Sequence, residues 1–444
     1  MSHQIILNAF LMSTGHHEAS WRLPESDVTS YRDVGHYQRL AQIAERGTMD
    51  SVFFADSPSI FGVNLERRPA EAIEPTLLLA AMAVATERIG LIATSSTTYE
   101  EPYNLARTFA SLDAISSGRA GWNVVTTADL AAGANFGMVE APSHAERYRR
   151  AEEFLEVVLG LWAGWRDDAT VADKAAGVFH DSRRVGILDH VGEHFRVRGP
   201  LNVGRSEQGH PVIVQAGSSV PGMALAARYA EAVFTAQPSI DDARAFYDEL
   251  KAATRRAGRN PDHIKILPGL VPILGGTQAE AQALERQLDD LVVLDHPLEQ
   301  LARDIGVPAE QIDLDAPLPA DIRPVSDIQG NKARYELTLR LARTENLTVR
   351  RLLLRLGSGR GHRAFAGTPE QVADTIEHWC TTGAADGFNI MPAVLPSGLE
   401  SFVDHVVPIL RSRGLFREDY TGTTLREHYG LPVPQAGRAL EAAG

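Results

Sequence analysis

The stretch SGRAGWNVVT, residues 117–126, contains the unit that repeats through the whole chain. Its apolar, β-rich centre at residues 120–125 has the length of one strand, and helical patterns flank it at residues 102–115 and 145–162. Strands that are buried on both faces of a parallel sheet consist of continuous apolar runs of this kind. A strand between two helices is the repeating unit of α/β proteins.

The same alternation extends from this stretch towards both ends of the chain. Apolar, β-rich runs lie at residues 5–12, 51–55, 89–93, 120–125, 211–216, 232–236, 264–274 and 387–393. Helical patterns lie at residues 34–46, 75–86, 102–115, 145–162, 221–229, 240–257, 278–293 and 369–381. Eight strands that alternate with helices predict a (β/α)8 TIM barrel, and an open doubly wound sheet is the alternative.

Two stretches, residues 164–209 and 295–367, are too long for simple connections. Segments of such length usually carry function or structure of their own. We therefore expect one barrel domain over residues 1–432 with insertions at these two places, and a flexible tail at residues 433–444. The second insertion contains an Arg-rich helical segment, residues 331–356, which is either a solvated amphipathic helix or a lid that anchors substrate.

Composition limits the classes of function. The formal net charge of −14 argues against a nucleic-acid or anionic-membrane partner, since both favour a basic surface. The chain shows neither a run of the roughly 20 apolar residues that span a bilayer nor an N-terminal secretory pattern. Cys380 is the single cysteine, which excludes an intrachain disulfide. These features predict a cytoplasmic enzyme.

Polar residues at the carboxyl ends of the strands are the first candidates for a site, because barrels carry their chemistry there. Asp56 ends the second run and either accepts from a ring N–H or a sugar hydroxyl, or only forms the turn before Ser57. Asn123, inside the fourth run, either faces the lumen and pairs with a polar heterocycle or is a satisfied structural residue. Thr97 lies among the hydroxyl residues that end the third run.

Two helix starts on the same side of the barrel suit a phosphate. Ser218 and Ser219 come directly before a proline and a helix, where free N–H groups and hydroxyls can bind an anion or simply cap the helix. His144 and Tyr148 are spaced four apart at the start of the helix after the fourth strand, so they share one face. They either donate to a phosphate or cap and pack the helix.

The sequence lacks the motifs of a metal site and of three other classes of protein. The histidines are scattered without a carboxylate pattern typical of metal ligands, so we expect no metal site. The sequence contains no GxxxxGK[ST] loop, no GxGxxG after the first strand and no GxSxG elbow. These absences disfavour a P-loop enzyme, an open dinucleotide-binding fold and an α/β-hydrolase.

Several motifs in order resemble one branch of the bacterial luciferase superfamily. That branch includes nitrilotriacetate, EDTA, dibenzothiophene sulfone and long-chain alkane monooxygenases and pristinamycin synthase components. The resemblance covers residues 5–432 and rests on SGRAGWNVVT at 117–126, EPYNLAR at 101–107, NFG at 135–137, RY at 147–148, AEEF at 151–154, RGPL at 198–201, QAGSS at 215–219 and AADGF at 384–388.

The resemblance implies a homo-oligomeric barrel, a homodimer or homotetramer, that binds reduced FMN supplied by a separate NAD(P)H:flavin reductase. It also implies which residues contact the flavin: Asp56 and Thr97 its ring or ribityl chain; His144, Tyr148 and Ser218 its phosphate or chain; and Ser219 and Asn123 as weaker candidates.

The implied reaction is a flavin-dependent monooxygenation. O2 is the co-substrate, a (hydro)peroxyflavin carries the oxygen, and a small organic substrate receives one atom of it. His144 is the single candidate for a catalytic group, although the phosphate role competes with it. An F420-dependent hydride transferase on the same fold and a non-catalytic flavin-binding protein are the alternatives. The motifs leave the substrate open.

Overall fold

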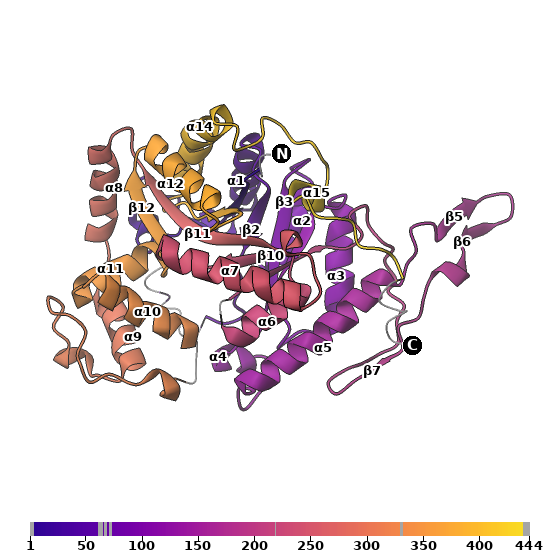
Figure 1. Cartoon of the computed structure of the whole chain (residues 1–444), viewed down its shortest axis with the longest axis horizontal. Helices are drawn as coiled ribbons and strands as arrows, with labels where there is room; N and C mark the ends of the chain where they lie inside the picture. The colour runs from indigo at the N-terminus through magenta and orange to yellow at the C-terminus, as the bar shows by residue number, and fades with distance from the viewer. Residues whose placement is uncertain are drawn as a thin grey trace.

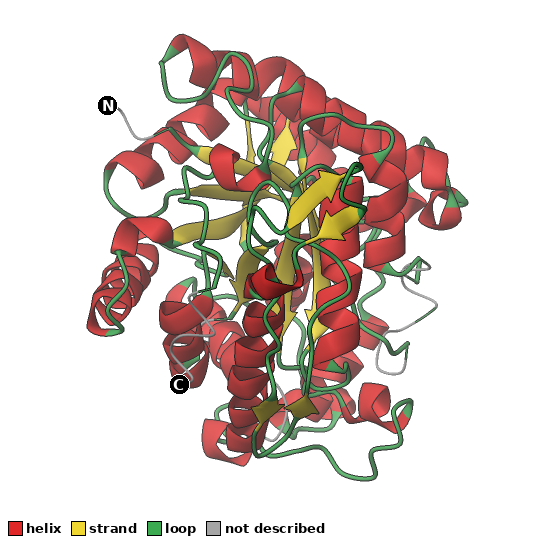
Figure 2. Cartoon of the chain, turned by 90° about the vertical axis from the view of Figure 1, so that its right-hand side faces the viewer, coloured by secondary structure: helices red, strands yellow, loops and turns green. Residues whose placement is uncertain are grey.

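Eight parallel strands close into a barrel in the computed structural model (Figures 1 and 2). The structure describes residues 4–60, 65, 69–70, 73–217, 219–328 and 332–437. The barrel strands are β1 (Ile6–Phe10), β2 (Ser51–Phe54), β3 (Gly90–Ser96), β4 (Ala120–Val125), β9 (Val212–Ala216), β10 (Ala232–Thr235), β11 (Lys265–Leu274) and β13 (Gly387–Ile390).

Closure of the sheet decides between the two predicted folds. Each strand pairs in parallel with the next in this order, and β13 returns to β1 with Gly387 opposite Ile6. An open doubly wound sheet has no such pairing between its first and last strands. The TIM barrel is therefore confirmed.

One strand of the main sheet was not predicted from the sequence. β12 (Arg363–Gly367) lies within the second predicted insertion and pairs with residues 270–274, the outer half of β11. Four of its five residues are only half-buried, so it lacks the continuous apolar character that identified the barrel strands.

Helices cover the outside of the barrel, as the red ribbons around the yellow strands in Figure 2 show. Outside the second insertion, the helices between barrel strands are α1 (Val34–Arg46), α2 (Pro75–Ala83), α3 (Pro102–Ile115), α4 (Leu130–Ala134), α5 (His144–Ala163), α6 (Val220–Tyr229), α7 (Ile240–Arg256), α8 (Gln278–Asp290) and α12 (Pro369–Thr381). Side chains that accept a first-turn N–H fix where several of them begin, among them Asp33 for α1, Ser143 for α5 and Ser219 for α6.

The first insertion contains two small hairpins. β5 (Thr170–Asp173) and β6 (Val178–His180) form an exposed hairpin that extends away from the barrel (Figure 1). β7 (His190–Val191) and β8 (Arg196–Val197) form the second, which lies on α5. The Glu153 carboxylate holds it there by accepting from the His190 ring and from the backbone N–H groups of residues 194 and 195, each at 2.9 Å.

The second insertion is helical and has its own apolar cluster. α9 (Asp295–Ile305), α10 (Lys332–Thr344) and α11 (Val349–Gly359) lie together beside the barrel (Figure 1). Surface ion pairs neutralise three of its arginines: Arg340 with Asp242 at 3.4 Å, Arg350 with Asp315 at 2.8 Å and Arg355 with Glu345 at 3.7 Å. These pairs favour the solvated-helix interpretation for these arginines.

After β13 the chain forms α13 (Ser397–Ser401), a π-helical turn (Phe402–Val406) and α14 (Val407–Ser412), which pack against α1 and α12 on the outside of the barrel. The segment that follows contains α15 (Leu425–His428) and packs against the N-terminal end of the barrel. The Tyr429 hydroxyl donates to Asn8 Oδ1 at 2.9 Å, and Asn8 donates in turn to Asn389 Oδ1 at 3.0 Å. The three buried side chains therefore occupy the interior of the barrel below the mouth. Among the described helices, none combines the length and apolarity that crossing a bilayer requires.

Candidate functional site

The predicted site residues gather at the mouth of the barrel, where the strands end. Asp56 follows β2, Thr97 follows β3 and Asn123 lies on β4. His144 and Tyr148 lie in the first two turns of α5, and Ser219 caps α6. Ser218 lies outside the described residues.

Tyr148 and Ser219 bring the starts of two helices together. The Tyr148 hydroxyl is 3.3 Å from Ser219 Oγ, which also accepts from the Gly222 N–H at 3.2 Å. A Cβ at Gly222 would lie 3.0 Å from Ser219 Oγ and 3.2 Å from the Tyr148 hydroxyl, so the glycine keeps this corner open. Helix N-termini with converging hydroxyls form a binding site for an anion. His144 stays exposed, with its ring centre 4.9 Å from that of Tyr148.

Arg147 is a functional candidate that the sequence analysis left out. Its side chain is buried at 6% exposure, and one guanidinium nitrogen donates to the Pro142 carbonyl at 2.7 Å. Its Nε has no hydrogen-bond partner, and within the described part of the chain no carboxylate pairs with it. Burial lowers the pKa of Arg147 from its usual value, as expected of a cation without a counter-ion. The motif match contained Arg147, but its burial could not be foreseen from the sequence.

The β4 side of the mouth presents a buried acceptor. Asn123 donates through Nδ2 to Thr94 Oγ1 at 2.8 Å, and Thr94 donates to the Phe54 carbonyl at 2.8 Å. This chain of bonds fixes the amide orientation and leaves Asn123 Oδ1 buried without a partner among the described residues. Thr97 is fully buried, and both its N–H and its hydroxyl donate to the Val125 carbonyl, at 3.0 and 3.2 Å. Its flavin contact stays a prediction.

Asp56 has an unusual acidity. It is exposed to solvent, yet the surrounding protein removes part of its hydration, and the carboxylates of Glu74 and Glu100 are near. Desolvation, followed by repulsion from Glu74, raises the pKa of Asp56 to about 6. The carboxyl group therefore changes charge within the range in which most enzymes work.

This acidity predicts a pH dependence of flavin binding. Riboflavin is the probe, because the FMN phosphate itself titrates near pH 6. A carboxylate accepts from flavin donors, so riboflavin affinity should rise by about threefold to tenfold from pH 5 to 7, as Asp56 loses its proton. Fluorescence titration of the Asp56→Asn variant should show a flat profile. An equal pH dependence in both proteins would contradict the role of Asp56.

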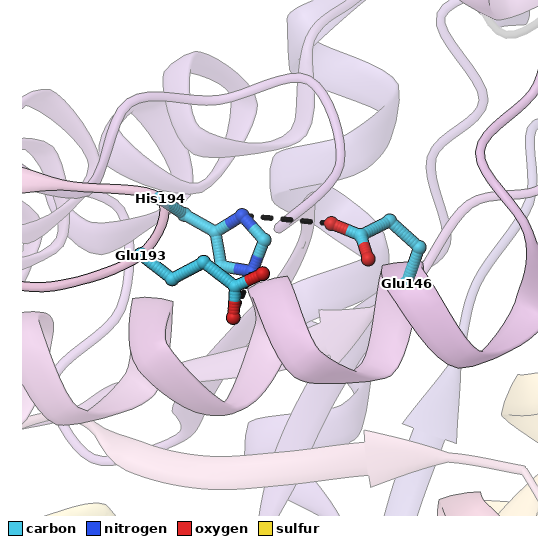
Figure 3. Close-up of side chains that lie close together, drawn as sticks. All are labelled: Glu146, Glu193 and His194. Carbon is cyan, nitrogen blue, oxygen red and sulfur yellow. Dashed lines mark ion pairs between the residues drawn. The ribbon is translucent and has the colours of Figure 1, made fainter.

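One group of possible metal ligands lies outside the mouth, where His194 is between two glutamates (Figure 3). The Nδ1 atom of His194 is 3.6 Å from a Glu146 carboxylate oxygen, whereas its Nε2 atom is 4.0 Å from Glu193. Glu146 is also paired with Arg149. Because the two carboxylates approach opposite nitrogens of one ring, and one already has a cation, the arrangement suits ion pairs between α5 and the second hairpin.

Three unpartnered polar atoms at the mouth are suited to hydrogen bonds with a ligand. Asn123 Oδ1, Arg147 Nε and Gln215 Oε1 are buried and lack hydrogen-bond partners among the described residues. Buried polar atoms in native proteins normally have partners, so a ligand that supplies donors to two of them and an anion to the third would complete the site. A flavin carries ring and ribityl donors and, as FMN, a phosphate. Gln215, on β9 beside Gly222, is a second candidate that the sequence analysis did not select.

The fold and this mouth define the class of a TIM-barrel protein with a ligand site at the carboxyl ends of its strands, and comparison with known proteins specifies the family. The family model of the luciferase-like monooxygenases matches residues 10–386. The chain is 47% identical to N-acetyl-S-(2-succino)cysteine monooxygenase of Bacillus subtilis (strain 168) and 45% identical to nitrilotriacetate monooxygenase component A of Aminobacter aminovorans, with 97% of each chain covered in both comparisons. It belongs to the luciferase-like monooxygenase family.

Solved structures support the same family assignment. EDTA monooxygenase from Chelativorans sp. BNC1 superposes with a TM-score of 0.80 at 39% identity, covering 98% of this chain and 100% of that one. A riboflavin lyase solved with modified FMN and riboflavin gives a TM-score of 0.84 at 31% identity, covering 98% of each chain. An F420-dependent reductase from Methanopyrus kandleri, at 16% identity and a TM-score of 0.54, shares only the fold.

Proposed function

We propose that this protein is the oxygenase of a two-component system. It binds FMNH2, which a separate NAD(P)H:flavin reductase supplies, and uses O2 as co-substrate. One oxygen atom enters a small organic substrate, the other leaves as water, and FMNH2 supplies the two electrons and is oxidised to FMN. The observation that carries the proposal is the buried, unneutralised Arg147 beside the corner formed by Tyr148, Ser219 and Gly222.

The proposed roles follow the position of each residue. Arg147, Tyr148, Ser219 and Ser218 bind the phosphate, with His144 at the edge of that corner; Asp56, Thr97 and Asn123 orient the ring or ribityl chain; and the mouth keeps water from the reacting atoms. His144 is the one candidate for moving a proton. The relative from Aminobacter aminovorans is named component A, which supports a separate reductase. We propose that the protein is cytoplasmic and forms a homodimer or homotetramer. Sedimentation analysis tests the oligomeric state.

The test begins with anaerobic titration of FMNH2 into the purified protein, followed by rapid mixing with O2. The proposal predicts tight binding of FMNH2 and a slower reoxidation of bound than of free flavin. With an oxidisable substrate, one atom of ¹⁸O from ¹⁸O2 should appear in the product. An absence of FMNH2 binding, or product without ¹⁸O, would refute the proposal.

The two alternatives predict different results in the same experiment. An F420-dependent hydride transferase would bind the deazaflavin tightly and reduce or oxidise its substrate without O2. A non-catalytic flavin-binding protein would retain oxidised FMN on purification and consume no substrate in the presence of a reductase. The relatives named as monooxygenases, at 45–47% identity, favour oxygenation over both.

A further inference from the structure

The turn at residues 97–100, directly after β3, is tied to two neighbouring elements. Its first residue, Thr97, donates to the carbonyl of Val125 at the end of β4. Arg150 of α5 donates through Nε to the Thr97 carbonyl at 3.0 Å and through a terminal nitrogen to the Glu100 carbonyl at 3.1 Å. One guanidinium therefore holds both ends of this turn.

A guanidinium suits this position better than any other side chain. Its donors lie in one rigid plane, so two carbonyl oxygens that accept from it are fixed relative to each other. Arg150 is half-buried, and burial lowers its pKa from the usual value although Glu101 and Glu153 favour the charged form. Hydrogen bonds from a charged donor that is partly shielded from water are stronger than those between neutral groups. The turn is thus held more firmly than by backbone bonds alone.

Phe195, between β7 and β8 in the first insertion, supports the guanidinium from outside the barrel. The Arg150 Cζ lies over the Phe195 ring, 4.4 Å from its centre, in the geometry of a cation–π contact. The ring is buried at 5% exposure and meets Phe154 of α5 edge-on, with centres 5.5 Å apart. The hairpin that Glu153 holds on α5 is therefore connected, through two side chains, to the turn that begins with Thr97.

We propose that Arg150 is a positioning residue for the flavin and that the second hairpin of the first insertion supports it. Arg150 acts through the turn at residues 97–100, and so through the proposed contact of Thr97 with the ring or ribityl chain. It follows Arg147 by three residues on α5, but its guanidinium is bonded to carbonyl groups, so its effect falls on the ring and not on the phosphate. The assignment rests on the proposed binding of reduced FMN and adds to it a part of the insertion on which the site depends.

The test compares Arg150→Met, which removes the donors, with Arg150→Lys, which keeps the charge, and Phe195→Leu, which removes the aromatic ring. Fluorescence quenching measures the affinities for FMN and riboflavin, anaerobic titration measures that for FMNH2, and urea gives the free energy of unfolding. Arg228→Met is the matched control. The Arg228 Cζ likewise lies over an aromatic ring, 5.1 Å from the centre of Tyr229, but its side chain is exposed.

We expect Arg150→Met to weaken FMN and riboflavin binding equally, by about 5- to 20-fold, because the turn loses two charge-assisted hydrogen bonds. The ratio of the two affinities should stay within about twofold of the wild type, since the phosphate contacts are unchanged. Phe195→Leu should shift both affinities in the same direction by a smaller factor, and Arg150→Lys should recover part of the loss. The double variant Arg150→Met, Phe195→Leu should bind flavin no more weakly than Arg150→Met, because both residues act through one contact.

Flavin affinities of Arg150→Met within about twofold of the wild type would overturn the assignment, whatever the change in stability. A loss for FMN alone would place Arg150 at the phosphate, and additive losses in the double variant would separate the hairpin from the site; either result would also overturn it. If Arg150→Met does not fold, Phe195→Leu and Arg150→Lys carry the same comparison. A wild-type protein that does not bind FMNH2 would instead overturn the proposed function.

Discussion

Replacing Arg147 with methionine should weaken FMN binding by about 10- to 100-fold while riboflavin binding changes by no more than about twofold. The reason is the buried position of the guanidinium, which has no carboxylate partner among the described residues and a free Nε. A phosphate would complete it with charge-assisted hydrogen bonds, and such bonds are stronger where water is excluded. Riboflavin lacks the phosphate, so its affinity should stay within that twofold range.

Fluorescence quenching titrations of both flavins measure this difference. Arg149→Met is the matched control, because the Arg149 side chain is exposed on the same helix and paired with Glu146, and this variant should bind both flavins as the wild type does. If Arg147→Met weakened FMN and riboflavin equally, Arg147 would support the shape of the mouth and not the phosphate. Unchanged FMN affinity would exclude Arg147 from the site.

Replacing Arg426 with methionine should lower the free energy of unfolding by about 3–5 kcal/mol at neutral pH. Arg426 is fully buried at the N-terminal end of the barrel, where it pairs with Glu231 and donates to the Gln208 carbonyl at 3.0 Å. Burial alone would raise the pKa of Glu231, but Arg426, together with His210 and the Ile213 N–H, outweighs burial and holds that pKa below its usual value. Without the guanidinium, the Glu231 carboxylate would remain buried and uncompensated.

Urea unfolding followed by circular dichroism tests this expectation. The loss should be smaller at pH 5 than at pH 7, because the uncompensated Glu231 would take up a proton as the pH falls. The double variant Arg426→Met, Glu231→Met should recover most of the stability, since a buried pair can be exchanged for apolar side chains at little cost. A single variant as stable as the wild type, or a double variant no better than the single one, would show that the pair does not stabilise the barrel as we infer.

The eight barrel strands and the helices between them could be predicted from the sequence because their patterns are local. A buried parallel strand is a short apolar run, and a capped amphipathic helix repeats its apolar residues every three or four positions. The same local logic selected Asn123, Tyr148 and Ser219, since carboxyl ends of strands and starts of helices can be located along the chain. β12 could not be predicted in this way because most of its residues are only half-buried.

Contacts between distant segments were decided only by the tertiary structure. The burial of Arg147 and the 3.3 Å approach of Tyr148 to Ser219 depend on how the strands close and how the helices pack around them. No sequence pattern encodes them, because a guanidinium on a solvated helix and one buried without a counter-ion have the same local neighbours. Burial and the identity of the nearest charge, which set the chemistry of the mouth, are properties of the folded barrel.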